Sequence, residues 1–114
     1  MKIIFVYNAE SGKLNALFDI AHKIINPETY QCSLCAITHD ALSEKKAWTE
    51  FKTNTKLELE FLHKDEFEKR YEQTYEYPII LEKSDSIKTL IDAEEISKFI
   101  TVEELIERIE QLST

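Results

Sequence analysis

Two cysteines with two residues between them, Cys32 and Cys35, are the side chains that most directly suggest chemistry. Such a pair at the start of a helix can form a reversible disulfide, because the helix dipole lowers the pKa of the first thiol and the turn brings both sulfurs together. The segment from Tyr30 to Thr38, however, is an apolar run that we predict to be a β-strand. Residues three apart on a strand point to opposite faces, so this prediction makes both cysteines buried and structural.

His39 and Asp40 follow this segment directly. A histidine and a carboxylate can share acid–base work, which makes the two residues a possible site. Adjacent residues rarely face each other, and Asp40 or Ser43 also suits the N-cap of a helix that we predict from Leu42 to about Thr53.

The spacing of Cys32, Cys35 and His39 is similar to that of metal ligands, with His22 or His63 as a distant fourth ligand. The chain has no second Cys-x-x-Cys pair, and the predicted strand separates the two thiols. We therefore predict no metal, and we expect no cofactor.

A third possible site is formed by Ser11, Gly12 and Lys13, where an apolar strand gives way to a predicted helix. Free backbone N–H groups and a lysine in such a place can hold an anion. The segment is similar to the end of a phosphate-binding P-loop, but Tyr7 occupies the earlier glycine position and Leu14 replaces the magnesium-binding Ser or Thr. Weak phosphate binding is the most that this segment predicts.

Composition limits the possible partners and the number of domains. The formal net charge is −8, which repels nucleic-acid phosphates and anionic membranes, so we expect neither as a partner. Hydrophobic residues make up 43% of the 114 residues, enough for one folded domain over 1–114. The apolar N-terminal run is too short for a signal peptide, and nothing approaches a membrane span, so we expect a cytoplasmic protein.

The elements that must position these residues follow from hydrophobic periodicity. Continuous or alternating apolar runs predict strands at 3–7, 30–38, 56–62, 79–81 and 87–91. Apolar residues three and four apart predict helices at about 14–25, 42–53, 65–71 and 102–112.

Helix starts are marked by two possible capping boxes. Thr101 and Glu104 form one, with Ile100 and Leu105 at the positions of a hydrophobic staple. Asp65, three residues before Glu68, gives a similar pattern for the shorter helix.

The resulting order, βαβαβαββα, predicts an α/β fold with a mixed sheet and helices on its faces. This order resembles thioredoxin, and so does the local sequence in which Tyr77 and Pro78 open an apolar strand that leads to a hairpin and an amphipathic helix. The resemblance implies a three-layer thioredoxin-like sandwich in which Pro78 is cis and faces the active site. A related oxidoreductase family carries Asp-Gly-x-Cys-x-x-Cys after its first strand, where this chain has Asn8 to Lys13 and no cysteine.

The sequence therefore predicts a thioredoxin-like domain without the usual redox pair in the usual place. Its expected function is non-catalytic binding of an unknown protein or peptide in a groove beside Pro78, with Tyr77, His39 and Asp40 as binding residues. Tyr71 and Tyr75 could extend the aromatic rim. The alternatives are thiol–disulfide exchange by the two cysteines and weak anion binding at the Ser11 segment.

Overall fold

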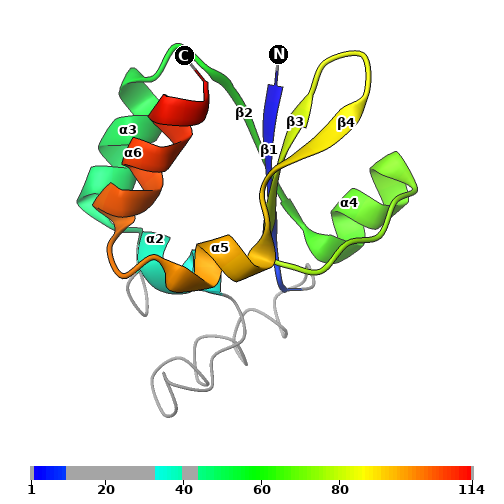
Figure 1. The fold of residues 1–114 in the computed structure, drawn as a ribbon, viewed down its shortest axis with the longest axis horizontal. Helices are drawn as coiled ribbons and strands as arrows, with labels where there is room; N and C mark the ends of the chain where they lie inside the picture. The colour runs from blue at the N-terminus through cyan, green and yellow to red at the C-terminus, as the bar shows by residue number, and fades with distance from the viewer. Residues whose placement is uncertain (1, 10–32, 40–43, 114) are drawn as a thin grey trace.

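The chain forms a mixed β-sheet with helices on both faces (Figure 1). This computed structural model describes residues 2–9, 33–39 and 44–113. The elements in chain order are β1 (Lys2–Tyr7), α2 (Ser33–Thr38), α3 (Lys46–Asn54), β2 (Glu58–His63), α4 (Lys64–Tyr71), β3 (Ile79–Lys83), β4 (Ile87–Ile91), α5 (Ala93–Lys98) and α6 (Val102–Leu112). The predicted α/β class is confirmed.

The four strands lie in the order β2-β1-β3-β4. Strand β1 is parallel to β2 and antiparallel to β3, while β3 and β4 form an antiparallel hairpin with a register shift at Ile80 and Leu81. The continuous apolar run predicted to be a buried strand is therefore an inner strand, with a neighbour on each side.

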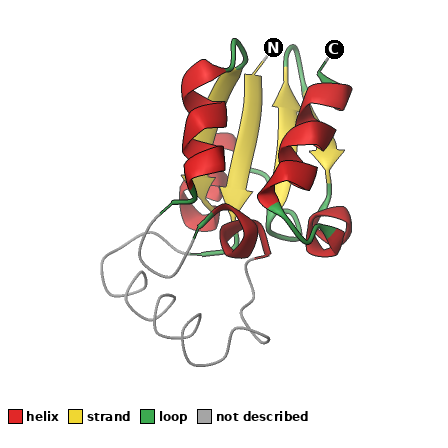
Figure 2. Cartoon of the chain, turned by 90° about the vertical axis from the view of Figure 1, so that its left-hand side faces the viewer, coloured by secondary structure: helices red, strands yellow, loops and turns green. Residues whose placement is uncertain are grey.

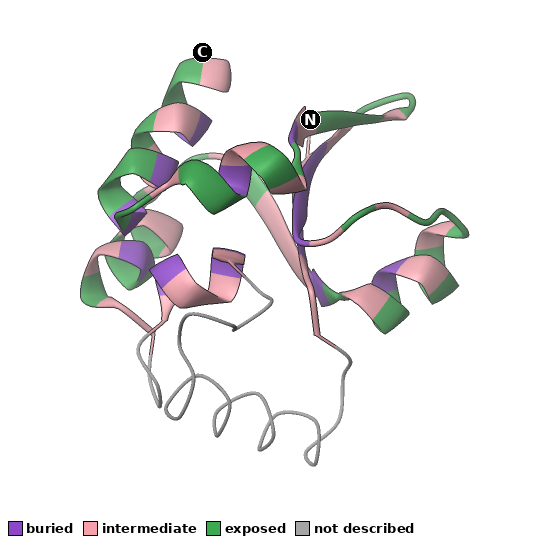
Figure 3. Cartoon of the chain, turned by 60° about the horizontal axis from the view of Figure 1, so that its bottom comes forward, coloured by how far each residue is buried: buried purple, intermediate pink, exposed green. Residues whose placement is uncertain are grey.

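Successive residues of β1 feed two separate cores, because side chains alternate across a strand. Ile3 and Phe5 pack on the side that carries α2, α3, α5 and α6, and Ile4 and Val6 pack on the side that carries α4 (Figures 1 and 2). The larger core holds Trp48, whose ring lies edge-on to Phe5 with centroids 5.5 Å apart. Burial is concentrated where the helices face the sheet (Figure 3).

The strand predicted from Tyr30 to Thr38 is wrong, because Ser33–Thr38 is helix α2. Its buried residues, Leu34, Ile37 and Thr38, have the three- and four-residue spacing of one helix face. Among the described residues the sheet thus has four strands, one fewer than predicted. The helix predicted at 14–25 lies outside the described residues.

The C-terminal half follows the prediction closely, with three corrections. The Thr101–Glu104 capping box is present, but Ile100 is 82% exposed, so the predicted staple is not formed. The box of α4 joins His63 and Glu66, not Asp65 and Glu68.

The third correction is helix α5, which was not predicted from the sequence, although Asp92 caps it by accepting a hydrogen bond from the backbone N–H of Glu95. No helix in the described part of the chain is long and apolar enough to cross a membrane.

Candidate functional site

Cys35 is the third residue of helix α2, in its first turn. It is half-buried and packs against the larger core, beside its fully buried neighbour Leu34. Cys32 lies outside the described residues and directly precedes the first helical residue, Ser33, in sequence. The objection to a cysteine pair rested on a strand through this segment, and residues Ser33–Thr38 are helical instead.

A polar cluster lies at the end of the same helix. The buried Thr38 hydroxyl donates to the carbonyl oxygen of Leu34 at 2.8 Å, and its oxygen lies 2.7 Å from Nδ1 of His39. The ring of His39 stands edge-on to Tyr7, the last residue of β1, with centroids 6.2 Å apart. This cluster therefore lies at the carboxyl end of an inner strand, where open α/β sheets commonly bind ligands.

Glu44 is the carboxylate of this cluster. It accepts hydrogen bonds from Thr49 at 2.7 Å and from Lys52 at 2.6 Å, and its Oε2 lies 3.6 Å from Nε2 of His39. Burial alone would raise the pKa of Glu44, but the hydrogen bonds from Lys52 and Thr49 and the charges of Lys52 and His39 outweigh burial and lower the pKa. The cluster is therefore an ion pair between Glu44 and Lys52 that also contacts His39, and it joins the end of α2 to α3.

The predicted partner of His39, Asp40, lies outside the described residues. The N-cap of α3 is Lys45, without a side-chain cap hydrogen bond, and the other predicted capping residue, Ser43, also lies outside the described residues. Glu44 could not be found from the sequence, because its contacts join residues five and eight positions apart and no short sequence pattern marks such contacts.

Pro78 is buried, and the peptide bond between Tyr77 and Pro78 is cis, as the resemblance implied. The hydroxyl of Tyr77 donates to Glu68 of α4 at 2.8 Å. Burial, followed by this hydrogen bond, raises the pKa of Tyr77 to about 12. This hydroxyl is thus engaged inside the protein.

The tyrosines before Pro78 pack around one phenylalanine. Ring centroids of Tyr71, Tyr75 and Tyr77 lie 5.2, 5.9 and 6.5 Å from that of Phe67. The described contacts of these rings are those of the smaller core, and peptide binding beside Pro78 stays a prediction.

Neither of the other two sites can be assembled from the described residues. Ser11, Gly12 and Lys13 lie outside them. Within residues 2–9, 33–39 and 44–113, no group of three or more His, Cys, Asp or Glu side chains is placed to hold a metal ion. His63 is the distant ligand considered for such a site, and its Nδ1 lies 2.7 Å from Oε1 of Glu66.

No family model, no curated protein and no solved structure matches this chain. The functional argument therefore depends on the chain's own residues and on how its elements arrange them.

Proposed function

We propose that the chain is a thioredoxin-like domain that carries out thiol–disulfide exchange through Cys32 and Cys35. The observation that carries the proposal is the position of Cys35 in the first turn of α2. A Cys-x-x-Cys pair with a cysteine in the first turn of a helix is typical of disulfide oxidoreductases, whereas the same pair inside a strand is not.

The sheet supports the thioredoxin-like part of the proposal. Strand β1 has a parallel neighbour on one side and an antiparallel hairpin on the other, and the amphipathic helix α6 follows the hairpin. Pro78 immediately precedes β3 and follows a cis peptide bond. These features resemble the thioredoxin family, although its usual Trp and Gly-Pro around the cysteines are missing here.

The proposed reaction reduces a disulfide of a partner molecule. The thiolate of Cys32 attacks one sulfur of that disulfide, forms a mixed disulfide and expels the other sulfur as a thiolate. The thiolate of Cys35 then attacks the sulfur of Cys32 and releases the second substrate thiolate. Two electrons pass to the substrate, and the resulting Cys32–Cys35 disulfide is returned to dithiol by a small-molecule or protein dithiol. The half-buried Cys35 suits the second, internal attack.

Redox titration in glutathione buffers, followed by thiol labelling and mass spectrometry, tests the proposal. We expect a two-electron couple between about −270 and −120 mV, the range of known oxidoreductases of this kind. Cys32→Ser should abolish disulfide reduction, while Cys35→Ser should accumulate the mixed disulfide, and Ser33→Ala should change neither. Two thiols that stay fully labelled across that range would rule the proposal out.

A further inference from the structure

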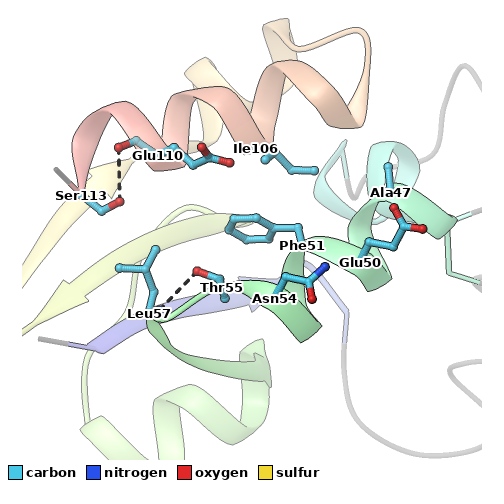
Figure 4. Close-up of a pocket in the computed structure, with 9 residues that line it drawn as sticks. All are labelled: Ala47, Glu50, Phe51, Asn54, Thr55, Leu57, Ile106, Glu110 and Ser113. Atoms are coloured by element: carbon cyan, nitrogen blue, oxygen red, sulfur yellow. Dashed lines mark hydrogen bonds between the residues drawn. The ribbon is translucent and has the colours of Figure 1, made fainter.

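Helices α3 and α6 enclose a surface groove of about 570 Å³. Its apolar part is formed by Ala47 and Phe51 of α3, by Leu57 just before β2 and by Ile106 of α6. The side chains of Phe51 and Ile106 lie in the space between the two helices (Figure 4). The groove does not involve Cys35 or the residues around Pro78.

The apolar lining of the groove comes from half-buried residues at the edge of each helix's core-facing stripe. On α3, Trp48 is buried in the core while Ala47 and Phe51, four residues apart, line the groove. On α6, Leu105 and Ile109 are buried in the core, while Ile106 is only partly buried and lines the groove.

The charged side chains that line the groove are both acidic. Glu50 lies on α3, and Glu110 lies one helical turn from Ile106 on α6. The exposed Glu103 lies three residues before Ile106, on the same side of the helix. A nearby cation, Lys46, lies 3.9 Å from Glu50, but both side chains are largely exposed, at 90% and 61%, so the pair neutralises little.

We propose that this groove binds a basic amphipathic helix of a partner protein. An apolar stripe on that helix would cover Phe51 and Ile106, while lysines or arginines along its flanks would meet Glu50 and Glu110. A second copy of this chain is a poor occupant, because two molecules of charge −8 repel each other. An anionic lipid surface is a poor occupant for the same reason.

The test uses the full chain and synthetic peptides of about 18 residues, long enough to become helical when bound. One peptide carries leucines at helical spacing among lysines, a second has the same composition in scrambled order, and a third has glutamates in place of the lysines. Fluorescence anisotropy gives the affinities, and amide NMR shifts locate the contact. We expect the first peptide to bind most tightly and to shift the amide signals of Ala47, Phe51 and Ile106.

Matched variants separate the groove from general charge attraction. Glu50→Lys with Glu110→Lys should lower the affinity for the first peptide about tenfold. Glu76→Lys with Asp85→Lys makes the same change in net charge at exposed positions outside the groove, and should have a much smaller effect. Cys32→Ser with Cys35→Ser should leave binding unchanged, which keeps this result independent of the redox proposal.

Several outcomes would overturn the inference. Equal weakening by both charge-reversal pairs, or equal binding of the scrambled peptide, would mean that charge alone attracts the peptide. Tight binding of the acidic peptide, or shifts confined to residues outside the groove, would also contradict it. Analytical sedimentation would assign the groove to a second copy instead if it showed self-association of the wild type and if Glu50→Lys with Glu110→Lys changed that self-association.

Discussion

The Thr38 hydroxyl oxygen lies 2.7 Å from Nδ1 of His39 while donating its own proton to the carbonyl oxygen of Leu34 at 2.8 Å. A hydroxyl has one proton, so Nδ1 of His39 must be the donor in the second contact. The ring is thereby held with Nε2 toward Glu44, 3.6 Å away. One hydroxyl thus orients the imidazole ring of the histidine beside the proposed redox helix.

Thr38→Val should lower the free energy of unfolding by about 1–2 kcal/mol, because it leaves a buried carbonyl and an imidazole N–H without this partner at nearly constant volume. Urea unfolding followed by the fluorescence of Trp48, which is buried in the larger core, measures the change. Thr53→Val is the matched control, since that exposed hydroxyl only returns to the carbonyl of Thr49. Equal unfolding midpoints for the two variants would contradict the hydrogen-bond chain.

Glu44→Gln should destabilise the protein by roughly 1 kcal/mol at neutral pH, because the amide cannot attract Lys52 as the carboxylate does. The pKa of Glu44 is lower than its ordinary value of 4.5. Its stabilising effect is therefore complete above that value and is lost as the pH falls below it. The difference in unfolding free energy between wild type and variant should shrink in acid, whereas the exposed Glu50→Gln should show little difference at any pH.

Tyr77→Phe should lower stability by about 0.5–1.5 kcal/mol at pH 7, through loss of the hydrogen bond to Glu68. Because the pKa of Tyr77 is raised from 10.0 to about 12, this contribution is complete below pH 10.0 and is lost as the pH rises through 12. The ring-carbon NMR signal of Tyr77 should accordingly titrate near pH 12. Tyr75→Phe removes a hydroxyl that donates to Gln73 at an exposed site, and it should lower the free energy of unfolding less than Tyr77→Phe does.

Thr101→Ala should cost about 0.5–2 kcal/mol of global stability, because it removes the N-cap of α6. The Thr101 hydroxyl accepts from the backbone N–H of Glu104 at 3.3 Å, and the Glu104 carboxylate accepts from the backbone N–H of Thr101 at 3.2 Å. Thr101→Ser keeps the capping oxygen and should stay close to wild type in urea unfolding. An unchanged midpoint for Thr101→Ala would show that the cap adds nothing to the docking of α6.

Elements with strong local signals could be predicted from the sequence. Helix α6 carries both a capping box and a long apolar stripe, and the hairpin has a polar turn, Ser84 to Ser86, between two apolar runs. These local preferences agree with the tertiary packing, which is why their predicted type and position hold.

The cysteine segment could not be assigned in this way. Leu34 and Ile37 fit a helix face, but in a short run rich in apolar residues the same letters also fit a buried strand. Packing of α2 against the larger core decides between them, and periodicity alone does not report such packing. Helix α5 is missed for a related reason, because its six residues bury only Ile96.

The His39–Glu44 pairing is beyond local sequence reasoning altogether. It depends on a backbone bridge between these residues and on a hydrogen bond from the N–H of Lys45 to the carbonyl of Thr38 at 2.9 Å. The sequence instead indicates the neighbouring Asp40 as the partner of His39, because adjacency is visible in a sequence and backbone pairing is not.

The outer strands of the described sheet bear on whether molecules of this protein can associate edge to edge. Edge strands present unpaired backbone groups that can recruit a further strand from another molecule. Here β2 carries the exposed Glu58 and β4 carries the exposed Lys88, and the register shift in the hairpin interrupts the regular ladder beside β4. Such charges and irregularities discourage strand addition, so monomers should remain dispersed at high concentration, and partners should dock on the helical face of the molecule.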